Sequence, residues 1–396
     1  MSATQLSIEQ AASTLRPVEA GERILALDVL RGFALFGVLL AYALWNLGTP
    51  PEDTYSSFDR ILNRGLTVLV DTKAYTLFAI LFGVGFSIQL TRASSRGARI
   101  VPVYCRRLLA LLLIGLTDAL LLRNGDILVP YATMGFILLL FRNASNRTLA
   151  IGAIVGLLFP YVARSAWELT GVPFPQRPET EGVGYFASNI AWVRYWYTIA
   201  ITSWPASLPM FLFGLYIGRS RFIDKIGAHR RWLWIALVAG LAIGVSAPVG
   251  VESIDRIWNG VPQPFAPRVI SGLLRSLHAW GLAAFYASSI LLLLQTPARQ
   301  RRLAPLAAVG RMALTNYLLQ SVILIPVCMA LNLFDRVTPA IGTLLALGVW
   351  TFQVPASIWW LKRFRFGPAE WLWRSLTYGH PQPMRAVQNQ TPAPTS

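Results

Sequence analysis

Two opposite charges lie three residues apart inside an apolar stretch that is long enough to cross a membrane. They are Asp28 and Arg31, in the run ILALDVLRGFALFGVLLAY. Residues three apart lie on the same face of a helix, and an ionised side chain in a bilayer is costly unless it is paired or lines a wet cavity. We therefore predict that both face a polar site inside a helix bundle, where they either act in catalysis or lock helix packing.

Two further carboxylates border the turn between the third and fourth apolar stretches. Asp118 lies near the end of the third stretch, and Arg107 shares its helix face but is about 16 Å away in helix rise. Asp118 therefore needs a partner on another helix. Asp126 follows an Asn-Gly turn, which suits the N-terminal cap of the next helix, and substrate binding is the alternative.

Lys73 and His278 are the other titratable candidates. Lys73 lies two residues after Asp71, so the two do not face each other on a helix; Lys73 is either a cation of the site or simply starts the second helix. His278 follows Arg275 at a spacing of three and lies within a span. It serves either as a base or as an ordinary hydrogen-bonded side chain.

Polar amides and arginines complete the set. Asn316 and Gln320 are four residues apart on one stripe, where they either contact substrate or hold helices together. Arg106, Arg107 and Arg311 lie near predicted cytoplasmic ends, where they either hold phosphate groups or extend to lipid headgroups. The three histidines and two cysteines lie in no metal-binding pattern, so we predict no metal site.

The elements that carry these residues are membrane spans. The chain of 396 residues is 55% hydrophobic and 13% charged, whereas soluble domains carry about 25% charged residues. Its apolar runs are far too long for barrel strands, so we predict an all-α polytopic bundle. About ten spans are expected: Ile24–Trp45, Leu66–Leu90, Tyr104–Leu122, Asp126–Phe141, Leu149–Leu169, Trp196–Gly218, Trp232–Gly250, Ile270–Leu294, Leu306–Leu331 and Ile341–Leu361.

The distribution of basic residues predicts the orientation. With the N-terminus in the cytoplasm, 22 of the 35 Lys and Arg residues fall in cytoplasmic segments, 9 in outer segments and 4 in spans. This excess on one side follows the positive-inside rule, and it places both termini in the cytoplasm. A basic face also attracts anionic headgroups. Nucleic-acid binding is excluded because no recognition module is present.

The predicted spans divide the chain into two halves of five helices. The fourth span is short, and Pro205 and Pro209 should break the sixth. The segments are a disordered tail (1–22), the first half (23–169), an outer loop (170–195), the second half (196–366), an amphipathic helix in the cytoplasmic interface (367–380) and a second disordered tail (381–396).

Several stretches together resemble a known family. They are LALDVLRGFALFGVLLAY (25–42), DTKAYTLFAILFGVGF (71–86), the NGDIL segment after the third span, and GRMALTNYLLQS (310–321). In combination they resemble the YeiB-like family of bacterial membrane proteins, whose C-terminal half is known as domain of unknown function 418. The resemblance extends over nearly the whole chain.

Through the LDxxRG pattern of its first span, the chain also distantly resembles transmembrane acyltransferases of the heparan-glucosaminide N-acetyltransferase kind. Such enzymes pass an acyl group from cytosolic acyl-CoA to a glycan across the membrane, which implies a site that is reachable from both faces. The chain departs from the pattern of its own family, which has Asn at Tyr42 and His at Asp118. The active histidine of the acyltransferases also has no counterpart after the first span.

The resemblance implies an acyltransferase in the cell inner membrane that uses acyl-CoA as a cosubstrate and binds no cofactor. A transporter and a non-catalytic membrane partner are the alternatives. Expected partners are membrane lipids and a small-molecule or glycan acceptor, and a homo-oligomer stays open. The candidate residues are catalytic Asp28, Arg31, Asp118 and His278, donor-binding Arg106, Arg107 and Arg311, and substrate-binding Lys73, Asp126, Asn316 and Gln320.

Overall fold

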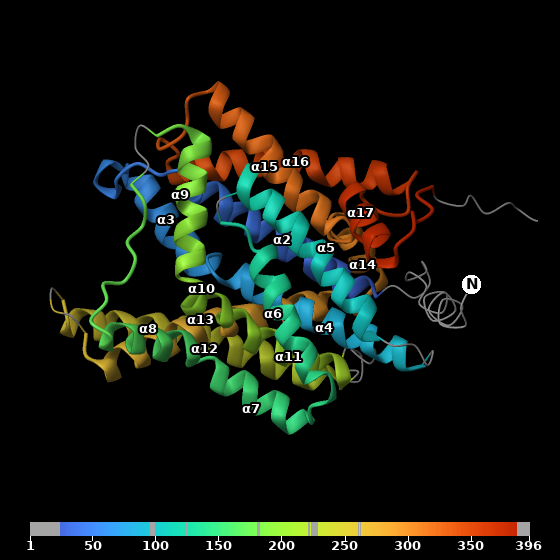
Figure 1. Ribbon diagram of the computed structural model, residues 1–396, viewed down its shortest axis with the longest axis horizontal. Helices are drawn as coiled ribbons and strands as arrows, with labels where there is room; N and C mark the ends of the chain where they lie inside the picture. Colours follow the sequence, from blue (N-terminus) through green and yellow to red (C-terminus); the bar gives the residue numbers. More distant parts are fainter. Residues whose placement is uncertain are drawn as a thin grey trace, which may run out of the picture.

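The computed structural model describes residues 24–95, 100–123, 125–179, 183–220, 222, 229–259, 261 and 263–385. Within them the fold is all-α, as predicted (Figure 1). The predictions for residues 1–22 and 386–396 lie outside the described part of the chain. The first half contains α2 (Leu25–Trp45), α3 (Ser57–Leu69), α4 (Lys73–Ser95), α5 (Ile100–Leu121), α6 (Leu128–Leu140), α7 (Asn146–Gly156) and α8 (Phe159–Leu169).

The segment 170–195 was predicted as an outer loop, but helix α9 (Tyr185–Thr198) occupies its last eleven residues. The helices that follow are α10 (Ala200–Ser203), α11 (Ser207–Arg219), α12 (Arg230–Ile257), α13 (Phe265–Leu293), α14 (Pro297–Arg311), α15 (Ala313–Ala330), α16 (Pro339–Leu361) and α17 (Pro368–Tyr378).

The described helices identify a multi-pass membrane protein. Eight segments are long and apolar enough to cross a bilayer, the bent pair α7–α8 adds a ninth, and the short apolar helix α6 occupies the predicted fourth span. Each of the ten predicted spans therefore corresponds to a helix or a helix pair. Runs of this length become helices because a backbone in lipid must satisfy its own hydrogen bonds.

Four spans are interrupted. In the second, residues 70–72 separate α3 from α4. The sixth breaks as predicted, at a 3₁₀ turn (Trp204–Ala206) that contains Pro205. The fifth was expected to be continuous, but α7 and α8 meet at 47°, because Pro160 has no N–H to bond to the carbonyl of Gly156. The ninth divides at Met312 into α14 and α15, so its predicted continuity was also wrong.

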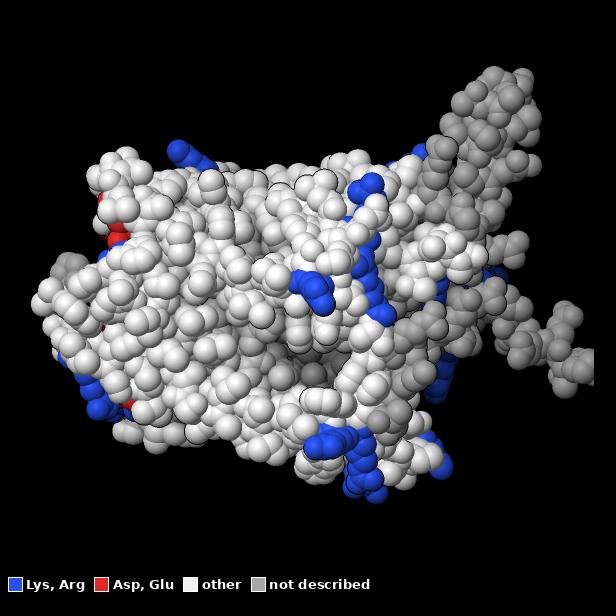
Figure 2. Space-filling model, turned by 90° about the horizontal axis from the view of Figure 1, so that it is seen from below, with Lys and Arg blue, Asp and Glu red and all other residues white. Residues whose placement is uncertain are grey.

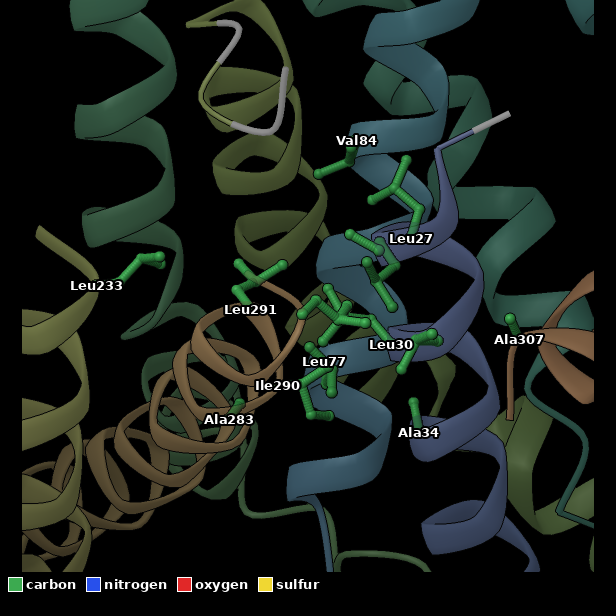
Figure 3. Close-up of a cluster of buried hydrophobic side chains, with 14 residues drawn as sticks. Leu27, Leu30, Ala34, Leu77, Val84, Leu233, Ala283, Ile290, Leu291 and Ala307 are labelled. Atoms are coloured by element: carbon green, nitrogen blue, oxygen red, sulfur yellow. The ribbon is translucent and has the colours of Figure 1, made fainter. Parts of the chain in front are cut away.

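Helix α2 is the central helix of the bundle. Its apolar window is 67% buried, the highest share among the eight candidate spans found in the described residues. It runs between α15 and α16 on one side and α11 to α13 on the other (Figure 1). In the core shown in Figure 3, Leu27 and Leu30 of α2 meet Leu77 of α4 and Ile290 of α13.

Glycines allow a close contact between α2 and α14. A Cβ atom at Gly32 of α2 would collide with the carbonyl oxygen of Leu306 in α14, and one at Gly310 would collide with that of Asp28. Small residues at such crossings let two backbones approach. This contact brings Arg311, the residue after Gly310, next to the first turns of α2.

The surface agrees with a lipid-facing belt. In the face shown in Figure 2, charged side chains gather toward the two ends of the molecule and the middle is nearly free of them. Helices α12 and α13 have 28 and 29 residues, whereas about 20 suffice to cross the hydrocarbon core. Their connected ends therefore extend beyond it.

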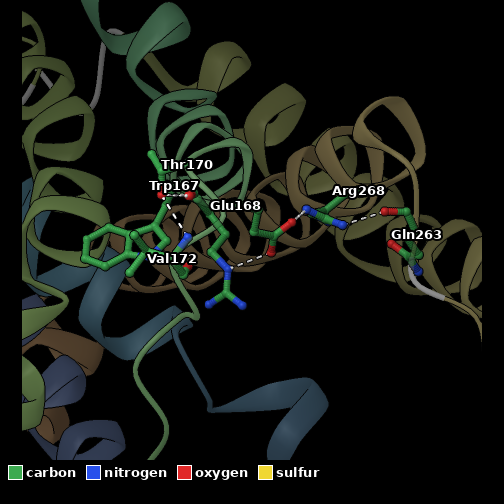
Figure 4. A network of polar contacts seen from close by, with 7 residues as sticks. Trp167, Glu168, Thr170, Val172, Gln263 and Arg268 are labelled. Atoms are coloured by element: carbon green, nitrogen blue, oxygen red, sulfur yellow. Dashed lines mark hydrogen bonds and ion pairs between the residues drawn. The ribbon is translucent and has the colours of Figure 1, made fainter.

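A polar network ties the two halves together at these ends (Figure 4). Glu168 of α8 forms ion pairs with Arg268 of α13 and with Arg164 of its own helix. Arg268 also donates a hydrogen bond to the carbonyl oxygen of Gln263 at 2.5 Å. The contact links the end of the first half to a long hairpin of the second.

Candidate functional site

A cavity of about 300 Å³ lies among α2, α4, α5, α14, α15 and α17. We call it the arginine cavity, because five of its lining residues are arginines and only two are acidic. Its other walls are largely apolar and aromatic. The charged residues are Arg31, Arg92, Arg107, Arg311, Arg374, Asp28 and Glu370.

Asp28 and Arg31 form an ion pair inside this cavity. The Nη1 atom of Arg31 lies 3.2 Å from Oδ1 of Asp28, and both side chains are only partly exposed. They are the fourth and seventh residues of the 21-residue helix α2. The pair therefore lies toward the predicted cytoplasmic end of the span and not at the bilayer centre.

The three predicted donor-binding arginines differ in their placement. Arg311 lines the cavity, and its buried Nε has no hydrogen-bond partner among the described residues. Arg107 also lines it, with its guanidinium 3.7 Å from the ring centre of Trp373. Arg106 is exposed and does not line the cavity, because adjacent helix residues point in different directions.

Helix α17 forms one wall of the cavity. Helix α15 starts directly after the break at Met312, so its first N–H groups lack partners within the helix. Buried Glu370 of α17 accepts hydrogen bonds from the N–H groups of Leu314 at 2.6 Å and Thr315 at 3.1 Å, and from the Thr315 hydroxyl. Burial raises the pKa of Glu370. The predicted interfacial helix is thus docked onto the bundle through a buried carboxylate.

Tyr317 separates the cavity from a second polar region. Its ring lines the cavity, and its hydroxyl donates to Oδ1 of Asp126 at 3.0 Å. The other oxygen of Asp126 accepts from the N–H of Val129 at 2.8 Å. Asp126 therefore caps the start of α6, which was the structural alternative for this residue.

Arg123 is the functional candidate that sequence reasoning missed. It lies between the third and fourth predicted spans, yet the residue is only 2% exposed. Its guanidinium lies between the rings of Tyr42 and Tyr317, at 3.7 and 4.1 Å from their centres. Its nitrogens donate to Ser321 at 2.9 Å and to Gln320 at 3.4 Å. No local pattern predicted this burial, because Tyr42, Tyr317 and Ser321 are distant from Arg123 in the sequence.

Asp118 lies in the same buried region. It is 1% exposed, and neither carboxylate oxygen has a hydrogen-bond partner among the described residues. It interacts electrostatically with Arg123, which follows its own helix, and with Asp126, just before α6. Tyr75 interacts electrostatically with both Arg123 and Asp71. We call Asp118, Arg123, Asp126, Tyr75 and Tyr317 the polar column.

Asn316 has a structural placement. Its amide donates to the hydroxyl of Ser357 at 3.0 Å and to the carbonyl of Val309 at 3.2 Å. It thereby ties α15 to α16 and α14, and it does not line the arginine cavity. Gln320 reaches the polar column through its bond to Arg123.

A second pocket, of about 520 Å³, lies at the connected ends of α12 and α13 and at the start of α4. Lys73 and His278 both line it. The Nζ of Lys73 donates to the carbonyl of Thr67 at 2.9 Å, and Nδ1 of His278 lies 2.7 Å from the carbonyl of Gly244. We call this the outer pocket, after its predicted side. It shares no lining residue with the arginine cavity.

Together these features define a multi-pass α-helical membrane protein with two pockets and a buried polar column. Residues 217–380 match the family described as "Protein of unknown function (DUF418)". The chain is 35% identical to "Uncharacterized protein YxaH" of Bacillus subtilis (strain 168), over 94% of its own length and 98% of that protein.

Two further relatives are similar over comparable lengths. An "Uncharacterized 39.9 kDa protein in amylase 3'region" of Bacillus acidopullulyticus is 31% identical over 93% of the chain and 97% of that protein. "Uncharacterized protein YeiB" of Escherichia coli (strain K12) is 30% identical over 90% and 96%. The chain therefore belongs to the family that contains YeiB and YxaH. No solved structure matches it.

Proposed function

We propose that the protein transfers an acyl group from cytosolic acyl-CoA to a hydroxyl or amine acceptor at the opposite face of the cell inner membrane. The observation that carries this proposal is the arginine cavity. It combines five arginines with apolar walls at the predicted cytoplasmic end. Such a lining suits a ligand with phosphate groups and an apolar arm.

The donor would bind with its phosphates on the arginines. The buried Nε atom of the partly exposed Arg311 has no hydrogen-bond partner among the described residues, and Arg107 is held in place by its contact with Trp373. Because coenzyme A is larger than the cavity, its nucleotide end would lie outside at the cytoplasmic surface. The pantetheine arm would then extend toward Tyr317.

The reaction needs one base. The C–S bond of the thioester breaks, a C–O or C–N bond to the acceptor forms, and the acceptor proton ends on the coenzyme A sulfur. Asp118 suits the role of the base, because an ionisable side chain that is buried in a membrane protein is expensive and is retained mainly for function. It lies in the polar column, on the far side of Tyr317 from the cavity.

Transport of an organic anion is the second candidate. Two pockets without a common lining residue suit a protein that opens alternately to each side. In that case Arg31 and Arg311 would bind the transported anion, and no thioester would be cleaved.

The two functions are separated by one assay on the purified full chain. Labelled acetyl-CoA is incubated with neutral sugars and amines, and its binding and the release of coenzyme A thiol are measured. The proposal expects saturable binding, which Arg311→Gln weakens and exposed Arg106→Gln leaves unchanged. Absence of both binding and thiol release would overturn it. Uptake of intact anion into proteoliposomes without thiol release would establish transport instead.

A further inference from the structure

We propose that the outer pocket binds an uncharged, polyhydroxylated molecule, such as a sugar. Its role as the acceptor site rests on the proposed acyl transfer, but the binding itself does not. The pocket encloses about 520 Å³, within the range of small-molecule sites. It is lined by residues 248–256 of α12 and by Arg275 and His278, the eleventh and fourteenth residues of the 29-residue helix α13.

The charges of this pocket are balanced. Three basic residues face three acidic ones, and Arg275 is paired with Asp255 at 2.8 Å, as Arg256 is with Glu252. Paired charges of both signs offer donors and acceptors for hydroxyl groups but no net attraction for an anion. An anionic ligand is therefore disfavoured here, in contrast to the arginine cavity.

Two features show that the surrounding structure holds the residues at the base of the pocket in fixed positions. Lys73 is only 3% exposed, yet it lines the pocket. Thr72 beside it has a φ of 63°, which is a strained conformation for a β-branched residue. Strain of this kind persists where the surroundings impose it, and it gathers at ligand sites. The turn lies directly before Lys73, whose ammonium group donates to the carbonyl of Thr67.

The position of Lys73 also relates this pocket to the donor site. Lys73 starts α4, and Phe78 of the same helix lines the arginine cavity. Five residues correspond to about 7.5 Å of helix rise. Asp71, in the outer pocket, interacts electrostatically with Tyr75 of the polar column. A bound acceptor would therefore lie at the outer end of this column.

Thiol protection tests the inference directly. Asn259→Cys places a thiol on the pocket wall, and Gln89→Cys places one in the arginine cavity as the matched control. Each full-length variant is labelled with a maleimide in detergent, with glucose, N-acetylglucosamine or glucose 6-phosphate present, and the unsubstituted protein gives the background from Cys105 and Cys328.

We expect a neutral sugar to slow labelling at Asn259→Cys but not at Gln89→Cys, and glucose 6-phosphate to protect less than glucose does. Adding Lys73→Gln should weaken protection about tenfold, because a buried partner of the hydroxyl groups is lost. His278→Gln serves as a second variant if Lys73→Gln does not fold, and a melting curve identifies that case.

The inference is overturned if no neutral sugar protects Asn259→Cys, if the phosphate ester protects best, or if neither pocket variant weakens protection. Binding of acetyl-CoA is measured in the same preparations. Acetyl-CoA binding without sugar protection would contradict the sugar site in the outer pocket but not the donor site in the arginine cavity. Sugar protection without acetyl-CoA binding would contradict the proposed acyl transfer but not the sugar site.

Discussion

The arginine cavity and the outer pocket differ in the balance of their charges. In the cavity five arginines meet two acidic residues, and one buried guanidinium nitrogen lacks a partner. In the outer pocket three basic residues meet three acidic ones, largely in ion pairs. An excess of arginines attracts anions, whereas balanced charges do not. This difference is the basis for our proposal of an anionic ligand at one end and a neutral one at the other.

The largest expected effect concerns the polar column between the two regions. Asp118→Asn should lower acyl transfer about 10²- to 10⁴-fold, the usual range for loss of a general base. The same change should alter the free energy of unfolding by only about 1 kcal/mol, because it removes the attraction to Arg123 together with the repulsion from Asp126. Thiol release and thermal melting measure the two effects. Full activity in this variant would show that another residue acts as the base.

The second-largest effect is expected for Glu370, in the wall that α17 forms in the arginine cavity. Glu370→Ala should lower the free energy of unfolding by about 3 kcal/mol, because three hydrogen bonds at the start of α15 are lost. The melting temperature and the affinity for acetyl-CoA should both fall. Asp255→Ala in the outer pocket is the matched control, and an equal loss there would contradict the special role of α17.

Glu370 also predicts a pH dependence. Burial raises its pKa in the folded state, so between the ordinary glutamate pKa of about 4.3 and the raised value the folded state binds more protons than the unfolded state. Stability from this group therefore falls as pH rises through that window. Melting temperatures of the native chain and of Glu370→Gln against pH test this, and the variant should have the flatter profile.

A smaller effect distinguishes the two ligands. Arg311→Gln should weaken acetyl-CoA binding by about 10- to 100-fold, the value of hydrogen bonds to a charged group. It should leave sugar protection at the outer pocket unchanged. Equal weakening at both sites would show that the two regions are not independent, and equilibrium dialysis of each ligand decides this.

The smallest effect is expected at the rim of the outer pocket. Arg275 is 59% exposed where it pairs with Asp255, and exposed ion pairs contribute about 1 kcal/mol or less. Arg275→Gln should therefore change the melting temperature little, and added salt should remove the difference. A large loss of stability would show that this pair is shielded from water.

Sequence alone predicted the membrane architecture well. Apolar runs of this length have few structural solutions in lipid, so all ten predicted spans correspond to helices. The spacing of Asp28 and Arg31 likewise predicted a shared face, because that geometry is local to one helix. The breaks at Gly156–Pro160 and at Met312 were missed, since the tolerance of a helix for an interruption depends on what packs beside it.

Tertiary structure decided which charges share a cavity. Arg106 and Arg107 are equivalent in the sequence, but only Arg107 faces α17. Arg123 lies next to a polar turn, between two predicted spans, yet its contacts with Tyr42 and Tyr317 bury it. These outcomes depend on residues that are distant in the sequence, because the cost of burying a charge is set by the groups that surround it in space.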